Sequence, residues 1–357
     1  MNTEILLVHP HSPQHMIVEH AAEILKRGRL VAFPTETVYG LGANALDPAA
    51  VQRIFTAKGR PSNNPLIVHV ATIEAACELT TAWTAKAQLL AERFWPGPLT
   101  IILPKAATVP DIVTGGGPTI ALRIPRHPVA LALLAAVKLP IAAPSANRST
   151  ELSSTKAEHV LNSLGGRIEM ILDGGPTPGG LESTVVDLSG SVPTLLRPGL
   201  ISPHDLRQVL PDLQLASHLR HDDVPTTDAH TMDGEEHAEP LISPGLMSKH
   251  YSPRAKLECW AIDGWRRVQE LLNDGATIGW LRWGHHTNLK HPRLKITDMP
   301  IGSPEFGSCL YAKLHDMDHA NVTHIVLDLP PDEEHWLAIR DRLRRASSAW
   351  NEPMTTV

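Results

Sequence analysis

The sequence predicts an α/β protein with two domains. Apolar runs of the length of buried strands alternate with helical patterns along most of the chain. Its 357 residues exceed the roughly 100–200 residues of an ordinary domain. Between about 211 and 254 the composition turns polar, acidic and histidine-rich. We therefore expect a first domain over 1–210, a linker over 211–254 and a smaller second domain over 255–357.

The first strands and the helix between them have clear local signals. The apolar run 30–33 predicts a buried strand. Asp47 followed by Pro48 is typical of a helix N-cap with proline at the first helical position, and Gly59 ends that helix. The apolar run 65–70 predicts the next strand.

The remaining elements follow in chain order. In the first domain we expect a long helix over about 73–93, a helix over 128–137, a helix from Ser202, and strands within 99–104, 119–125, 139–147, 168–175, 183–188 and 193–199. In the second domain we expect strands within 255–262, 275–283 and 322–330, and helical patterns near 264–272, 304–316 and 332–350. This succession predicts a βαβ-type, Rossmann-like second domain.

Composition excludes several classes of function. The formal net charge of −6 argues against broad capture of RNA or DNA, which depends on surplus Lys and Arg to neutralise phosphates. The N-terminal segment has no signal-peptide pattern, and no uncharged apolar run approaches the ~18 residues of a membrane span. Cys77, Cys259 and Cys309 are odd in number and far apart, which predicts neither a disulfide framework nor a zinc site. We expect a cytoplasmic protein.

Motifs of several enzyme classes are absent from the sequence. It contains no G-x-x-x-x-G-K-[ST] phosphate loop, no G-x-S-x-G elbow and no H-E-x-x-H. The linker histidines His218, His221, His230 and His237 lack metal-site spacing, and we interpret them as a solvated face. No resident metal is expected.

The segment AKGRPSNNPLIVHV (57–70) places two cations at the end of a helix and directly before a buried strand. Lys58 and Arg60 can be explained by the helix dipole, which favours cations at a C-terminus whatever their function. They can also bind a polyphosphate, together with the amide of Asn64. We expect Lys58→Ala or Arg60→Ala to abolish turnover and to leave the melting temperature nearly unchanged; a large drop would favour the structural interpretation.

Arg123 lies in the otherwise apolar strand within 119–125. Thr119 precedes it by four residues, so both side chains are expected on the same face of the strand. A buried cation needs a partner. A bound carboxylate or phosphate would serve, and so would a structural Asp or Glu.

Other strand ends also carry polar side chains. Thr37 follows the first strand, Ser145 and Asn147 follow the strand at 139–147, and Ser183 and Arg197 stand at the ends of two later strands. Each can cap local backbone or line a site for a small polar ligand. Repetition at five strand ends favours the second interpretation.

Six segments in order resemble the YrdC-like family: PTETVYGLG, KGRPSNNPLIVHV, TIALRIPRHP, APSAN, ESTVVDL and LLRPG. The linker segment SPGLMSKHYSP followed by an α/β domain resembles the long, two-domain form of that family. A Ser-Gly pair usually follows S-A-N in the family, and Thr150 stands here in the glycine's place. Leu246 and Met247 occupy linker places where the family tends to have Met and Arg. The resemblance implies a twisted, mostly parallel sheet with a large basic cavity.

The resemblance also implies roles for individual residues. On the threonine side it implies Thr37, His69, Arg123, Ala143 and Ser183. On the ATP side it implies Lys58, Arg60, Asn64, Thr119, Ser145, Asn147, Ser153, Arg197 and Tyr251. Lys58 and Arg60 would be the catalytic cations, acting with the Mg²⁺ that accompanies ATP. His250 and Tyr251 would form a lid.

The reaction implied by the resemblance joins L-threonine, bicarbonate and ATP into threonylcarbamoyl-AMP and pyrophosphate. The product would pass to a separate tRNA-modifying transferase, so strong direct binding of nucleic acid is not expected. Two other hypotheses are a YrdC-like RNA-binding or ribosome-associated module without this catalysis, and a carbamoyl-transfer relative with another acceptor. An RNA-binding module would retain RNA with a steep salt dependence.

Overall fold

Two β-sheets organise the chain, and the computed structural model describes residues 2–219, 251–284 and 289–351 of it. The first sheet has eleven strands, in the order β1 (Glu4–Leu7), β8 (Met170–Asp173), β2 (Val31–Phe33), β3 (Gly40–Asn44), β7 (Ile141–Ala142), β4 (Ile67–His69), β6 (Thr119–Arg123), β5 (Leu99–Pro104), β9 (Thr184–Asp187), β10 (Thr194–Arg197) and β11 (Gln214–Leu215). The second has five, in the order β14 (Leu294–Met299), β13 (Ile278–Trp283), β15 (His324–Asp328), β12 (Lys256–Trp260) and β16 (Ala349–Asn351).

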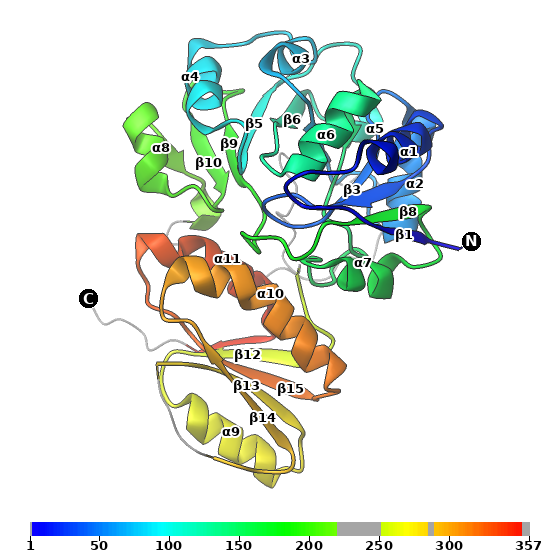
Figure 1. Ribbon diagram of the computed structural model, residues 1–357. Coiled ribbons are helices and arrows are strands. Elements are labelled where there is room, and N and C mark those ends of the chain that lie inside the picture. The colour runs from blue at the N-terminus through cyan, green and yellow to red at the C-terminus, as the bar shows by residue number, and fades with distance from the viewer. Residues whose placement is uncertain (1, 220–250, 285–288, 352–357) are drawn as a thin grey trace.

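Helices cover both sheets (Figure 1). Those of the first half are α1 (His15–Lys26), α2 (Pro48–Lys58), α3 (Ile73–Cys77), α4 (Ala85–Phe94), α5 (Asp111–Thr114), α6 (Pro128–Val137), α7 (Ala157–Leu164) and α8 (Pro203–Val209). Those of the second half are α9 (Gly264–Asn273), α10 (Ser303–His319) and α11 (Leu337–Ala346). Short 3₁₀ turns lie at Ser217–Leu219 and Glu334–Trp336. No helix in these ranges is long and apolar enough to cross a membrane.

The first sheet is mixed, so the expectation of a mostly parallel sheet was wrong. Its described strand pairs are parallel and antiparallel in equal number, five of each. The reason is visible in the connections. Only a few residues link β2 to β3 and β9 to β10, and such short connections can join only antiparallel neighbours.

Several local predictions were confirmed, and one helix was wrong. Asp47 caps α2 by accepting a hydrogen bond from the Ala49 amide at 2.9 Å, with Pro48 in the first turn. The expected helix over 73–93 is two helices, α3 and α4. Between them the Thr81 amide bonds to the carbonyl of Pro104, and the Thr84 hydroxyl caps α4. Backbone pairing with the end of β5 therefore wins over helix continuation.

The first sheet has a hydrophobic core on each face. On one face α1 and α6 pack against β2 and β8, through residues such as Leu25 and Leu133. On the other, α2, α4, α7 and α8 contribute side chains such as Ile54 and Leu90. Because helices cover both faces of the sheet, the faces are apolar. A polar site can therefore form only at the ends of the strands.

The second sheet is all-parallel. In chain order its strands run 3-2-4-1-5, so the parallel α/β character was predicted correctly, while the order differs from the 3-2-1-4-5 of dinucleotide-binding sheets. The sequence predicted three strands; β14 and β16 were missed because these edge strands are only partly buried.

Helices α10 and α11 lie between the two sheets (Figure 1). Their buried side chains share one hydrophobic cluster with Val38, Leu152 and Leu181 of the first half. The hydrophobic core of the second half therefore includes side chains of the first half. This contact places the C-terminal helices behind the polar strand ends of the first sheet.

Candidate active site

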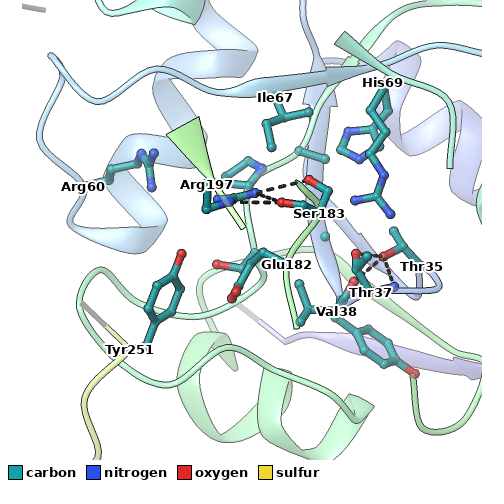
Figure 2. Close-up of a pocket in the computed structure, with 16 residues that line it drawn as sticks. Thr35, Thr37, Val38, Arg60, Ile67, His69, Glu182, Ser183, Arg197 and Tyr251 are labelled. Carbon is teal, nitrogen blue, oxygen red and sulfur yellow. Dashed lines mark hydrogen bonds between the residues drawn. The ribbon is translucent and has the colours of Figure 1, made fainter. Parts of the chain in front are cut away.

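A cavity of about 530 Å³, including its open mouth, lies where the strand ends of the first sheet meet (Figure 2). It is lined by Thr35, Thr37, Val38, Tyr39, Gly40, Arg60, Ile67, His69, Arg123, Ala143, Pro144, Ser145, Glu182, Ser183, Arg197 and Tyr251. Cations, hydroxyl groups and a histidine thus surround one concave space, the kind of lining that suits a polar ligand. The sequence predicted this convergence from the repetition of polar strand ends.

Lys58 and Arg60 are buried at the C-terminal end of α2, with Gly59 between them in the left-handed conformation at φ 61°. The Lys58 ammonium donates to the carbonyl of Ser145 at 2.6 Å and to the carbonyl of Asn147. Burial lowers the pKa of Lys58, and the nearby charge of Arg60 lowers it further. Lys58 therefore fastens the segment after β7 to the end of α2.

Arg60 points its guanidinium group into the cavity while keeping local partners. Its Nη2 donates to Oδ1 of Asn64 at 2.5 Å and to the carbonyl of Pro65 at 2.9 Å. Burial lowers its pKa to about 10, which still leaves it charged at neutral pH. The Asn64 side chain is fully buried and holds the arginine from behind.

The segment 145–153 contributes one wall of the cavity. Nδ2 of Asn147 donates to the carbonyls of Arg148 and Glu151. Its Oδ1 is buried and has no hydrogen-bond partner among the described residues. Thr150 has φ 69°, a conformation that a β-branched residue rarely adopts. The chain thus follows the path that glycine would favour, and Thr150 accepts a hydrogen bond from the Ser252 amide.

Arg197 comes from the end of β10 and reaches the start of β9. Its Nε and Nη2 donate to the carbonyl of Ser183 at 3.1 and 3.0 Å, and Nη2 also donates to the Ser183 hydroxyl at 3.2 Å (Figure 2). The Ser183 hydroxyl is 2.8 Å from that of Thr100. Two strand ends and one cation are therefore held together without a ligand.

Arg123 forms a buried ion pair with Glu36. Its Nη2 donates to Oε1 of Glu36 at 2.7 Å, and its Nε donates to the carbonyl of Gly97 at 3.3 Å. Burial alone would raise the pKa of Glu36, but Arg123 holds it below its usual range. The structural partner is thus present, while the Nη1 of Arg123 makes no hydrogen bond within the described residues.

His69 at the end of β4 lies next to Arg123, to which it is paired in the sheet register. Its ring is buried, and Nδ1 has no hydrogen-bond partner among the residues described. Burial, followed by the charge of Arg123, lowers its pKa to about 3, so the ring is neutral at physiological pH. An unsatisfied nitrogen beside a cation marks this end of the cavity as a polar ligand site.

Two further positions shape the same end of the cavity. The hydroxyl groups of Thr35 and Thr37 are 2.7 Å apart, and Thr35 also donates to the carbonyl of Val38. The Ala143 amide is committed to the carbonyl of Ile67. Ala143 lines the cavity, but its amide already has a backbone partner.

Tyr251 closes the cavity opposite Arg60 (Figure 2). Its backbone has φ 62°, and its side chain is buried against Tyr311 of α10 at 5.8 Å between ring centroids. His250, Leu246 and Met247, and the linker histidines His221, His230 and His237, lie outside the described residues. His218 is exposed, as expected of a solvated histidine, with Nε2 3.1 Å from the carbonyl of Leu196.

Most, but not all, of the described residues to which the sequence assigned a role line the cavity. Those that do are Thr37, Arg60, His69, Arg123, Ala143, Ser145, Ser183, Arg197 and Tyr251. Lys58, Asn64, Asn147 and Ser153 stand just behind, each bonded to a lining residue or its neighbour. Thr119 is partly exposed at the far end of β6, about 13 Å along the strand from Arg123 at 3.3 Å per residue. Sharing a face with Arg123 does not bring it to the cavity.

Two carboxylates at the cavity were given no role from sequence. Glu36 neutralises Arg123, and Glu182 lies beside Tyr251 and Arg197 (Figure 2). Both stand in segments that the sequence singled out for their hydroxyls. The signal available in the sequence was Arg123. A buried cation requires a countercharge, so an Asp or Glu in one of the neighbouring motifs was to be expected.

Comparison with known proteins identifies relatives for the whole length of the chain. The family described as "Telomere recombination" matches residues 23–199, and the one described as "Threonylcarbamoyl-AMP synthase, C-terminal domain" matches residues 201–348. A threonylcarbamoyl-AMP synthase of Pyrococcus abyssi is 40% identical over 336 residues, 92% of this chain and 93% of its own. One of Bacillus subtilis is 41% identical over 336 residues, 92% of each chain.

The fold is similar to that of a solved relative as well. The crystal structure of P. abyssi Sua5 complexed with L-threonine superposes with a TM-score of 0.87 at 37% identity, covering 98% of this chain and 100% of that one. Similarity at this level extends over both sheets.

Proposed function

The chain belongs to the family of threonylcarbamoyl-AMP synthases, and from this premise we propose how its cavity divides between L-threonine and ATP. As a nucleotidyltransferase of this family it joins threonine, as a carbamate, to the AMP part of ATP. The carbamate forms from the threonine amine and bicarbonate with loss of water. One carbamate oxygen then attacks the α-phosphorus, and pyrophosphate leaves with the electrons of the broken P–O bond.

The threonine end is the one with His69 and Arg123. The observation that carries this assignment is the buried, unpartnered Nδ1 of His69 beside the Nη1 edge of Arg123, which also lacks a partner among the described residues. An amino-acid carboxylate would accept from that edge. Thr37, Ala143 and Ser183 would surround the rest of the molecule, as the sequence predicted.

The ATP end is the one with Arg60, Arg197, Ser145 and Tyr251. Arg60 and Arg197 are buried cations that face the same space, and charge neutralisation in a water-poor site stabilises a displacement at phosphorus. The third donor of the Lys58 ammonium and the unpartnered Oδ1 of Asn147, as far as the described residues show, would complete this end. Asn64 and Ser153 do not line the cavity and would hold the lining residues Arg60 and Glu182 in place. An ATP-side role for Thr119 stays a prediction, because Thr119 does not line the cavity either.

Mg²⁺ fits this site only as a companion of the nucleotide. The described residues contain no group of three or more His, Cys, Asp or Glu side chains that could hold a metal. Magnesium commonly keeps its waters and binds substrate phosphates with few protein ligands, so the phosphates of the nucleotide would hold it without a dedicated protein site. When bound, it would supply further charge neutralisation on the phosphates.

The wider assignments rest on the same premise. Bicarbonate would be the carbon donor, and a separate tRNA-modifying transferase would consume the product. Residues 1–210 would form the catalytic domain and 255–357 the C-terminal domain, with His250 and Tyr251 of the linker between them closing over the cavity. Closure would exclude the water that hydrolyses a mixed anhydride.

Threonine-dependent release of pyrophosphate tests the proposal. Purified protein with ATP, Mg²⁺ and bicarbonate is expected to release pyrophosphate, and threonylcarbamoyl-AMP to accumulate, when L-threonine is added. Replacing threonine by other amino acids separates this reaction from carbamoyl transfer to another acceptor. Release that is no faster with threonine than without it would overturn the proposal, and RNA retention that falls steeply with salt would favour an RNA-binding module.

A further inference from the structure

Glu182 puts a buried carboxylate beside a cavity that must accept a triphosphate. Its side chain is only 6% exposed. Oε1 accepts a hydrogen bond from the Ser153 hydroxyl at 2.5 Å, and Oε2 accepts from the Tyr311 hydroxyl at 3.2 Å. An uncompensated negative charge at this place would repel the ligand or capture a cation that the ligand needs.

The compensating charge comes from the other end of the chain. Nε of Arg342, in α11, donates to Oε2 of Glu182 at 2.7 Å. Arg342 is 1% exposed and lies 160 residues away in sequence. Burial alone would raise the pKa of Glu182, but the charges of Arg342 and then Arg197 hold it below its usual range, so the carboxylate is ionised.

Arg342 also holds two other parts of the ATP end. Its Nη2 donates at 3.0 Å to the carbonyl of Pro198, the residue directly after Arg197. Its guanidinium carbon lies 5.4 Å from the centre of the Tyr251 ring, in cation–π contact. The loop at Gly199 packs so closely on the start of β9 that a Cβ there would lie 2.7 Å from the carbonyl of Glu182. One side chain of the second sheet's helices thus fixes three segments at the ATP end.

We propose that Arg342 is a positioning residue for ATP, acting through Glu182 and the Arg197–Pro198 turn. Arg342 pairs with Glu182, so that the charge of this carboxylate is not neutralised by Arg197 and Arg60. Its hydrogen bond to the carbonyl of Pro198 fixes the backbone next to Arg197 and thereby the orientation of the Arg197 side chain. The C-terminal half is therefore part of the electrostatics of the nucleotide site. This inference rests on the proposed assignment of that end to ATP.

A double-mutant cycle of Arg342→Gln and Glu182→Gln tests the inference. The quantity measured is the affinity for ATP, by calorimetry in the absence of threonine. Arg342→Gln is expected to weaken ATP binding by about 30-fold, because it leaves Glu182 buried without its ion-pair partner and turns its charge toward Arg197. In the background of Glu182→Gln the same substitution is expected to cost less than about 3-fold, because the charge to be compensated is gone. In turnover the KM for ATP is expected to rise far more than the KM for threonine.

Arg340→Gln is the matched control. Arg340 lies on the same helix and is 5% exposed, but its hydrogen bond to the carbonyl of Pro330 and its ion pair with Asp332 stay within the C-terminal half. It is expected to leave ATP affinity within about twofold of the unsubstituted protein, as for a site without contact to the ligand region. If Arg342→Gln does not fold alone, Arg342→Lys is compared in the two backgrounds instead.

Three results would overturn the inference. They are an ATP affinity of Arg342→Gln equal to that of Arg340→Gln, an equal loss in both backgrounds, and an equal rise of both KM values. Because ATP binding is measured without turnover, a protein that binds ATP but releases no pyrophosphate would contradict the proposed reaction and still decide the role of Arg342. A protein that does not bind ATP at all would contradict both.

Discussion

His69 illustrates how one residue can serve a site and reduce stability at the same time. Its neutral ring is suited to a ligand because Nδ1 is left without a partner among the described residues. The sequence predicted its place beside the threonine end through resemblance. It could not predict the neutral state, because that depends on burial and on the register that puts Arg123 alongside.

We predict that His69 makes the fold acid-sensitive. Its pKa is about 3 in the fold and lies at the ordinary value of 6.5 in the unfolded chain, so only the unfolded state binds a proton between these values. The free energy of unfolding therefore falls as pH falls from 6.5, by about 1.4 kcal/mol per pH unit, or about 2 kcal/mol between pH 6.5 and 5. In urea unfolding, His69→Asn is expected to lose less free energy of unfolding between pH 6.5 and 5 than the unsubstituted protein, by about this amount.

The control for this prediction is His15→Asn, because the His15 side chain is exposed on α1. It should keep the pH dependence of the unsubstituted protein. An unchanged slope in His69→Asn would show that His69 is not buried in the neutral form.

At the scale of elements, the end of α2 joins two explanations that the sequence left as alternatives. Lys58 lies in the last turn of α2 and Arg60 just beyond the Gly59 cap, where the helix dipole favours cations. Lys58 also donates to two carbonyls after β7, and Arg60 to the carbonyl of Pro65. The structure therefore supports a structural role for both cations, and the proposed phosphate role adds to it.

The carbonyl contacts of Lys58 replace the expectation of an unchanged melting temperature, and we predict that Lys58→Ala lowers stability as well as turnover. The buried carbonyl of Asn147 loses its Lys58 donor, and such a group costs about 1–3 kcal/mol when left unsatisfied, while the carbonyl of Ser145 keeps the Asn147 amide as a donor. The melting temperature and the rate of pyrophosphate release are the two measurements. Arg53→Ala, at an exposed position of the same helix, is the control and is expected to change both only slightly. A Lys58→Ala variant with an unchanged melting temperature would confine Lys58 to ligand binding.

Elements bounded by proline and capping residues were predicted correctly, whereas α1, α7, β1 and β3 were missed and elements whose limits depend on partners were misplaced. The boundaries of α2 and α6 follow from proline and capping residues within a few positions. The break between α3 and α4 depends on a hydrogen bond from Thr81 to the distant strand β5, and β14 and β16 are half-buried edges. No local pattern carries that information.

At the scale of the whole molecule, one point of contact between the two halves requires a glycine. Gly180 has φ 72°, and its amide donates to the carbonyl of Thr37 at the cavity. A Cβ on Gly180 would lie 2.5 Å from the carbonyls of Gly307 and Ser308 in α10. The loop that carries Glu182 is thus pressed between the cavity and the second half.

We predict that Gly180→Ala separates the two halves locally and weakens the site. Gly175→Ala is the matched control, since Gly175 has φ 82° but nothing within 4 Å of a Cβ. Left-handed strain costs each variant about 1–2 kcal/mol, and the backbone clash is expected to cost Gly180→Ala at least about 1–3 kcal/mol more. The free energy of unfolding and the affinity for ATP are the measurements. Equal effects of the two substitutions would mean that α10 moves away freely.

The sequence by itself determined the α/β class, most strands and helices, and the set of polar side chains that would meet. These depend on periodicity, capping and spacing, which act over a few residues. Only the tertiary structure decided that the first sheet is mixed, that Thr119 stays far from Arg123, and that Glu36 and Glu182 provide countercharges. It alone brought Arg342, one of several similar arginines in α11, to the ATP end. Such pairings are made across about 160 residues by packing, and packing leaves no trace in the local pattern.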